Sequence, residues 1–107
     1  MLTYQQPQLD ALGDATRRGI LERLLNGPMP VGKLAHGFPV SRPAISQHLR
    51  VLEQAKLVKH ENAGTRRVYQ LDPRGIDALR EYFDRFWTQA LSAFKNQVEK
   101  PSAKESE

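Results

Sequence analysis

The stretch SRPAISQHLRVLEQAKLV, from Ser41 to Val58, reads as a capped helix that leads directly into a strand. The hydroxyl of Ser41 can accept a hydrogen bond from the amide of Ala44, which is the usual chemistry of a helix N-cap. Pro43 is tolerated there, because the amides of a first helical turn have no intrahelical acceptor. The sequence therefore predicts that a helix begins next to Ser41.

The predicted helix has two chemically different faces. At about 100° per residue, one side gathers three aliphatic residues, Ile45, Leu49 and Leu52. The opposite side carries Pro43, Ser46, Gln47 and Arg50. Glutamine can bond to adenine, arginine to guanine or phosphate, and serine to either, so the polar face suits DNA; a merely solvated face is the alternative interpretation.

Two further helices are predicted before this stretch. Pro7 suits the first turn of a short helix that stops near Gly13, and Asp14 is a suitable N-cap for the segment ATRRGILERLLN. Gly27 and Pro28 are residues that typically end such a helix. Between Pro30 and Pro39, the segment VGKLAHGF is predicted as a short helix at best.

A hairpin and a long helix are predicted after it. The segments LVKHE and RRVYQL are short β-type runs joined by NAGT, whose Asn62 and Gly64 tolerate the positive φ of a hairpin turn. Asp72 and Pro73 then begin a helix from Arg74 to about Glu99, roughly 39 Å long at 1.5 Å per residue. That helix contains five of the eight aromatic residues of the chain.

This order of elements is that of a winged helix-turn-helix domain. The predicted fold class is mainly α with a small β-hairpin, with about five helices and a two-stranded wing. Residues 1–100 form the single domain, and the polar tail 101–107 is expected to be disordered.

The positive charge of the chain is concentrated in the same region. Between Ser41 and Arg67 there are six basic and two acidic residues, whereas the rest of the chain has ten of each and so contributes no net charge. A solvated basic surface would suffice for this pattern, but a surface that neutralises phosphates explains it better.

Several classes of protein are disfavoured by what the sequence lacks. Without cysteine there is no disulfide framework and no thiolate site, and the chain offers no paired acid, base or nucleophile for an enzyme. No signal peptide and no run of 18 apolar residues is present, so we expect a cytoplasmic protein without a membrane partner.

Three stretches resemble the ArsR (arsenical-resistance repressor) family of bacterial transcriptional regulators: LGDATRRGILERLLNGPMPVGKLA, FPVSRPAISQHLRVLEQAKLV and GTRRVYQLDPRGIDAL. The resemblance extends over roughly Leu9 to Phe94. It implies a homodimeric repressor that blocks a promoter by binding a pseudo-palindromic operator in double-stranded DNA, with recognition helices in successive major grooves and wings at the flanking minor grooves. The DNA-binding residues it implies are Ser41, Arg42, Pro43, Ser46, Gln47, His48, Arg50, Arg66 and Arg67.

Two departures from the family pattern matter. Metal-sensing members often carry cysteines before the recognition helix or histidines on the last helix, and both are missing here. His36, His48 and His60 fall on three different elements, so neither a metal nor another cofactor is expected. Lys56 stands where the family often has glycine, at an expected cost of roughly 1 kcal/mol if its backbone is left-handed.

The apolar residues of the last helix are too widely spread to be buried on so small a body, which favours a two-fold partner. The predicted dimer interface comprises Leu9, Leu12, Phe83, Phe86, Trp87, Ala90, Leu91 and Phe94. An effector pocket lined by the aromatic residues is the alternative, and a small molecule, a partner protein and abundance alone stay open as the regulating signal. A winged-helix module that binds protein instead of specific DNA is the alternative function.

Overall fold

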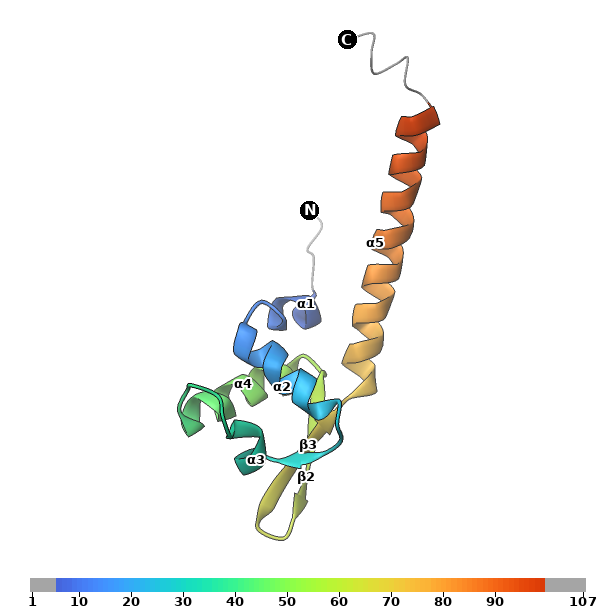
Figure 1. Cartoon of the computed structure of the whole chain (residues 1–107). Coiled ribbons are helices and arrows are strands. Elements are labelled where there is room, and N and C mark those ends of the chain that lie inside the picture. The colour runs from blue at the N-terminus through green and yellow to red at the C-terminus, as the bar shows by residue number, and fades with distance from the viewer. Residues whose placement is uncertain (1–5, 100–107) are drawn as a thin grey trace, which may run out of the picture.

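The computed structural model describes residues 6–99, which form five helices and a three-stranded sheet (Figure 1). The helices are α1 (Pro7–Ala11), α2 (Ala15–Leu24), α3 (Val31–Ala35), α4 (Arg42–Gln54) and α5 (Pro73–Glu99). The strands are β1 (Met29–Pro30), β2 (Val58–Ala63) and β3 (Arg66–Leu71). The predicted winged helix-turn-helix and its five helices are confirmed. The predicted tail, 101–107, lies outside the described residues.

Both predicted N-caps form as expected. The Asp14 carboxylate accepts hydrogen bonds from the amides of Thr16 and Arg17, at 2.8 and 3.1 Å, and so begins α2. The Ser41 hydroxyl accepts from the amide of Ala44 at 3.2 Å and begins α4. These caps satisfy first-turn amides and fix where the two helices begin.

The core lies where α2, α3 and α4 meet the sheet. The apolar face predicted for α4 is buried, since Ile45, Leu49 and Leu52 have no exposed surface. Around them lie the other buried apolar side chains: Ala11, Ile20, Leu24, Leu34, Ala55, Leu57, Val58 and Tyr69. Burial of the aliphatic stripe leaves the opposite face of α4 to solvent.

The wing contains one strand more than the sequence predicted. β1 pairs antiparallel with β3, placing Met29 opposite Tyr69 and Pro30 opposite Val68, so the strand order is β1-β3-β2. The hairpin turn is also shorter than expected: Asn62 pairs with Arg67 inside the ladder. Only Gly64–Thr65 remain between the paired strands.

The joint between α4, β2 and α5 is built on the backbone. Lys56 adopts the left-handed φ of +63° that its place in the family pattern suggested. The amide of Gly75 donates to the Lys56 carbonyl at 2.8 Å, and the amide of Asp72 donates to the Leu57 carbonyl at 2.9 Å. The first turn of α5 is thereby fixed to the turn that ends α4.

Beyond this joint α5 projects away from the rest of the chain (Figure 1). The Cα radius of gyration is 19.3 Å, against about 13 Å for a compact domain of 100 residues. Among residues 6–99, no helix has the length and hydropathy needed to span a bilayer. The projecting part of α5 therefore lies at the surface, and the exposure of its apolar side chains needs an explanation.

Candidate nucleic-acid interface

The outer face of α4 presents the polar residues that the sequence singled out. Ser46, Gln47 and Arg50 are all exposed. Arg50 donates a hydrogen bond from Nη1 to the Gln47 Oε1 at 3.2 Å, which holds the two side chains beside each other on this face. The N-terminal residues Ser41, Arg42 and Pro43 are exposed as well. This face can offer several donors to base edges or phosphates at once.

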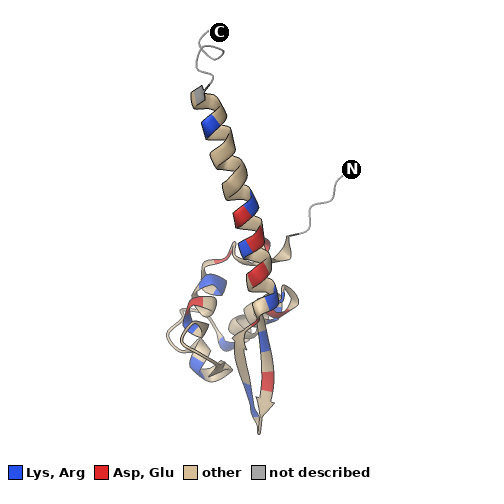
Figure 2. Cartoon of the chain, turned by 90° about the vertical axis from the view of Figure 1, so that its right-hand side faces the viewer, with Lys and Arg blue, Asp and Glu red and all other residues tan. Residues whose placement is uncertain are grey.

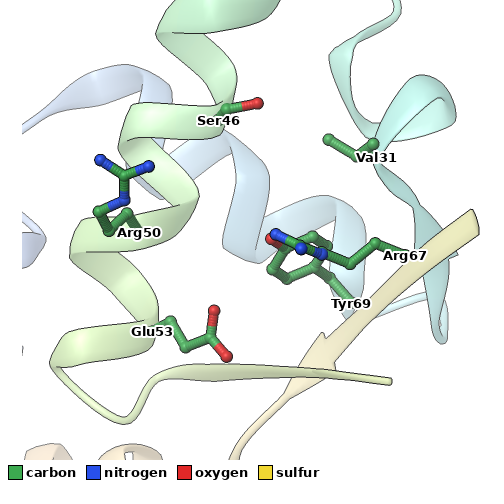
Figure 3. A pocket seen from close by; sticks show the side chains of 6 residues that line it. All are labelled: Val31, Ser46, Arg50, Glu53, Arg67 and Tyr69. Carbon is green, nitrogen blue, oxygen red and sulfur yellow. The ribbon is translucent and has the colours of Figure 1, made fainter. Parts of the chain in front are cut away.

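A hollow of 210 Å³ separates α4 from the wing (Figure 3). Its lining comprises Val31, Ser46, Arg50, Glu53, Arg67 and Tyr69. Figure 3 shows Ser46, Arg50 and Glu53 following one another down α4, while Arg67 and Tyr69 come from β3 on the opposite side. Positive side chains thus approach the hollow from both of its walls.

The base of the wing is attached to the recognition helix by a polar contact. His60 of β2 lies with its Nδ1 2.7 Å from the Glu53 Oε2 of α4. The rings of His60 and Tyr69 are 5.3 Å apart and tilted, across the β2–β3 pair. This contact fixes the orientation of the wing relative to α4, so the two elements are positioned together.

His48 occupies a different position from its neighbours on α4. Its side chain is only 19% exposed, and Nδ1 lies 3.3 Å from the Arg17 Nη1. Its Nε2 lies 3.9 Å from Asp14, whose pKa is lowered chiefly by the hydrogen bond from the Arg17 amide. His48 therefore packs between α4 and the N-terminus of α2, which agrees with a packing or phosphate-contacting role more than with base readout.

The wing residues Arg66 and Arg67 border a second, larger groove of 510 Å³. Its other walls come from α3 and from the N-terminal end of α4, where they supply Lys33 and Arg42. The sequence alone did not single out Lys33, because the excess of positive charge begins only at Ser41. Lys33 comes close to the wing arginines only when the chain folds and α3 packs beside the wing.

Comparison with known proteins agrees with this geometry. A family model described as a helix-turn-helix domain matches residues 12–61. The chain is 56% identical over 101 residues to the HTH-type transcriptional regulator Rv2034 of Mycobacterium tuberculosis, covering 92% of this chain and 94% of that one. It is 40% identical to the transcriptional repressor SdpR of Bacillus subtilis, over 58% of this chain and 69% of that one.

A solved crystal structure points to the same family. An ArsR family transcriptional regulator superposes with a TM-score of 0.72 at 28% sequence identity, covering 81% of this chain and 93% of that one. The chain belongs to the ArsR family. It is a DNA-binding transcriptional regulator and not an enzyme, so the predicted family and class of function are confirmed.

The charge distribution of this ArsR family member separates two regions (Figure 2). Lysine and arginine, with a few acidic residues among them, mark the body and the wing, and both kinds of charge mark the first half of α5. From Phe86 to Val98 the only charged residue is Lys95. The outer half of α5 therefore lacks the charge expected of a solvated helix.

The same half of α5 exposes large apolar side chains. Phe86 is 58% exposed, Trp87 63% and Phe94 64%. Phe83, Leu91 and Val98 are exposed too. At 3.6 residues per turn these positions cover an arc of about 140°, which is wider than a single coiled-coil seam. Two of the predicted interface residues, Leu9 in α1 and Leu12 at its C-cap, are only half-buried, and α1 packs against α5.

Proposed function

We propose that this ArsR family protein is a cytoplasmic homodimeric repressor that binds a pseudo-palindromic operator without a metal. The apolar face of α5 carries the proposal, because a free monomer would leave six large apolar side chains in water: Phe83, Phe86, Trp87, Leu91, Phe94 and Val98. A second copy related by a two-fold axis can cover this face with the same face of its own α5.

Dimerisation determines the kind of DNA site. Two copies related by a two-fold axis present two α4 helices, and major grooves on one side of the duplex recur at about 34 Å. We assign base readout to Gln47 and Arg50, with Ser46 beside them, and phosphate or minor-groove contact to Arg66 and Arg67. The operator is then an inverted repeat of two half-sites.

Repression and metal independence have separate supports. The relative SdpR is named a transcriptional repressor, which supports the same role for this protein. Within residues 6–99, no three histidine or acidic side chains gather as a metal site, and the whole chain is free of cysteine. Control by a metal would therefore lack a set of converging ligands.

The test is selection of bound fragments from genomic DNA of the source organism, followed by fluorescence anisotropy on the recovered site. We expect inverted half-sites, tighter binding to the complete repeat than to one half-site, and no effect of a chelator. Recovery of no site above background, with weak binding that does not distinguish sequences, would favour the protein-interaction module. Loss or gain of binding with the chelator would contradict metal independence.

A further inference from the structure

Two groups of basic side chains in the described chain differ in their partners. Most of the arginines of α2 and α5 are already engaged: Arg17 donates to the carbonyl of Ala11 at 2.7 Å, Arg18 to that of Leu12 at 2.6 Å, and Arg74 pairs with Asp72 at 2.7 Å. Such side chains have structural acceptors and are less available to a ligand.

The second group lines the 510 Å³ groove between α3, α4 and the wing. It comprises Lys33, Arg42, Arg66 and Arg67. All four are exposed, and none of them has an ion pair or a side-chain hydrogen bond within residues 6–99. The groove has no acidic residue in its lining. Four uncompensated positive charges therefore face one hollow.

The Arg42 side chain lies against the α3 wall of this groove. Gly32 lies on its wall, and the Arg42 guanidinium is 3.8 Å from the point where a Cβ on Gly32 would stand. The Arg42 side chain thus extends from the first turn of α4 back over α3. The remaining lining, Pro30, Val31 and Thr65, is uncharged.

We propose that this groove binds the phosphodiester backbone of the operator, and that Lys33 of α3 is a phosphate-contacting residue outside both the recognition helix and the wing. The inference rests on the proposed operator binding and adds a site to it. The groove borders the exposed N-terminal end of α4, and in a helix-turn-helix the first helix crosses the sugar-phosphate backbone. Lysine supplies a point charge with three donors, which suits phosphate without reading sequence.

The first measurement is the salt dependence of binding by anisotropy, for the operator and for an unrelated duplex of equal length. Lys33→Gln should weaken both duplexes by a similar factor and reduce the log-log salt slope by about 1.8 per dimer, because each of the two protomers leaves one phosphate unneutralised. Between 50 and 200 mM salt, the affinity of the variant should therefore fall by a factor about 12 times smaller than that of the wild type. Lys95→Gln is the matched control, because Lys95 is an exposed lysine on the distal half of α5.

The second measurement locates the phosphate that Lys33 binds. A set of operator duplexes, each with one phosphate replaced by a neutral methylphosphonate, is titrated with both proteins. With the wild-type protein several positions should weaken binding, and with Lys33→Gln one of those positions in each half-site should lose its effect, as a double-mutant cycle requires for a direct pair. Circular dichroism confirms that each variant is folded.

The outcomes separate this inference from the proposed function. An unchanged salt slope and an unchanged methylphosphonate pattern in Lys33→Gln, with wild-type operator preference intact, would overturn the groove assignment alone. A wild-type protein that does not prefer the inverted repeat would overturn the proposed function instead. An equal loss for Lys95→Gln would show that only overall charge matters, which also contradicts a localised site.

Discussion

The amide of Gly75 donates a 2.8 Å hydrogen bond to the carbonyl of Lys56, and a Cβ at position 75 would stand 2.2 Å from that same oxygen. Glycine is therefore required at this point for steric reasons. The hydrogen bond joins the helix that carries the exposed apolar face to the turn that ends the recognition helix.

Replacing this glycine should destabilise the fold. Gly75→Ala forces the first turn of α5 away from Lys56, and we expect a loss of about 3 kcal/mol in the free energy of unfolding. Denaturant unfolding followed by circular dichroism measures it. The control is Gly32→Ala, where the nearest atom to the new Cβ is 3.8 Å away; we expect a change within about 1 kcal/mol. Equal losses in both variants would contradict the steric explanation.

Lys56 itself stores backbone strain, because its φ is +63°. Lys56→Gly should raise the free energy of unfolding by about 0.5 to 1 kcal/mol, since glycine adopts this conformation without a Cβ clash. Lys59→Gly, inside β2, removes the same charge but should destabilise the strand. A less stable Lys56→Gly protein in thermal unfolding would mean that the lysine side chain makes interactions that outweigh the strain.

The pH dependence of stability should reflect Asp72, which is buried at the start of α5. The Arg74 guanidinium, bonded to its carboxylate, lowers the Asp72 pKa from 3.8 to about 2. A depressed pKa stabilises the fold at pH values above 3.8, and this contribution is lost as the pH falls towards 2. Its size at neutral pH is on the order of 1 to 2 kcal/mol, allowing for the exposure of Arg74.

The variant that isolates this effect is Asp72→Asn, which can still cap the helix but cannot ionise. Its stability should fall below that of the wild type at pH 7, and the difference should shrink between pH 4 and pH 2. Asp77→Asn, an exposed carboxylate 3.8 Å from Arg80, serves as control and should change stability by less than about 0.5 kcal/mol. A constant difference at all pH values would rule out the ion pair as its cause.

Gln47 and Arg66 should contribute to DNA binding in different ways. Gln47→Ala should relax the base preference at one position of each half-site and cost on the order of 1 to 3 kcal/mol there. Arg66→Ala should weaken all sequences more evenly. Binding to a library of randomised half-sites measures both. Sequence preference left intact by Gln47→Ala would move base readout to another part of the surface.

Trp87 should support dimer formation, being 63% exposed on the apolar face of α5. Trp87→Ala should shift the protein towards monomer in sedimentation at micromolar concentration. Thr88→Ala, the next residue, is exposed and lies outside the apolar arc, so it should leave the dimer unchanged. A Trp87→Ala protein that keeps the wild-type mass would place Trp87 in an effector pocket or another interface.

The helices could be predicted because their signals are local. Asp14 and Ser41 cap helices whose aliphatic residues follow a 3.6-residue period, and both caps form at hydrogen-bond distance. β1 could not be predicted: Met29–Pro30 is too short to show alternation, and its proline marks a turn in sequence. It becomes a strand only because β3 offers it an edge.

The exposure of the polar face of α4 was predictable for the same reason, since burial of Ile45 and Leu49 leaves Ser46, Gln47 and Arg50 outside. The side-chain pairing of His48 with Arg17, and the position of Lys33 beside Arg66, depend on how separate elements pack. Neither relation has a sequence spacing that would reveal it.

Dimerisation through the exposed face of α5 would also determine how operator occupancy depends on the concentration of the protein. While monomers predominate, the concentration of the dimer rises with the square of the monomer concentration. We consider the case in which only the dimer binds the operator tightly. Operator occupancy then changes more steeply than protein level, so a modest fall in synthesis or rise in degradation releases the promoter abruptly. In that regime the number of copies in the cell acts as a signal of its own, without any inducer.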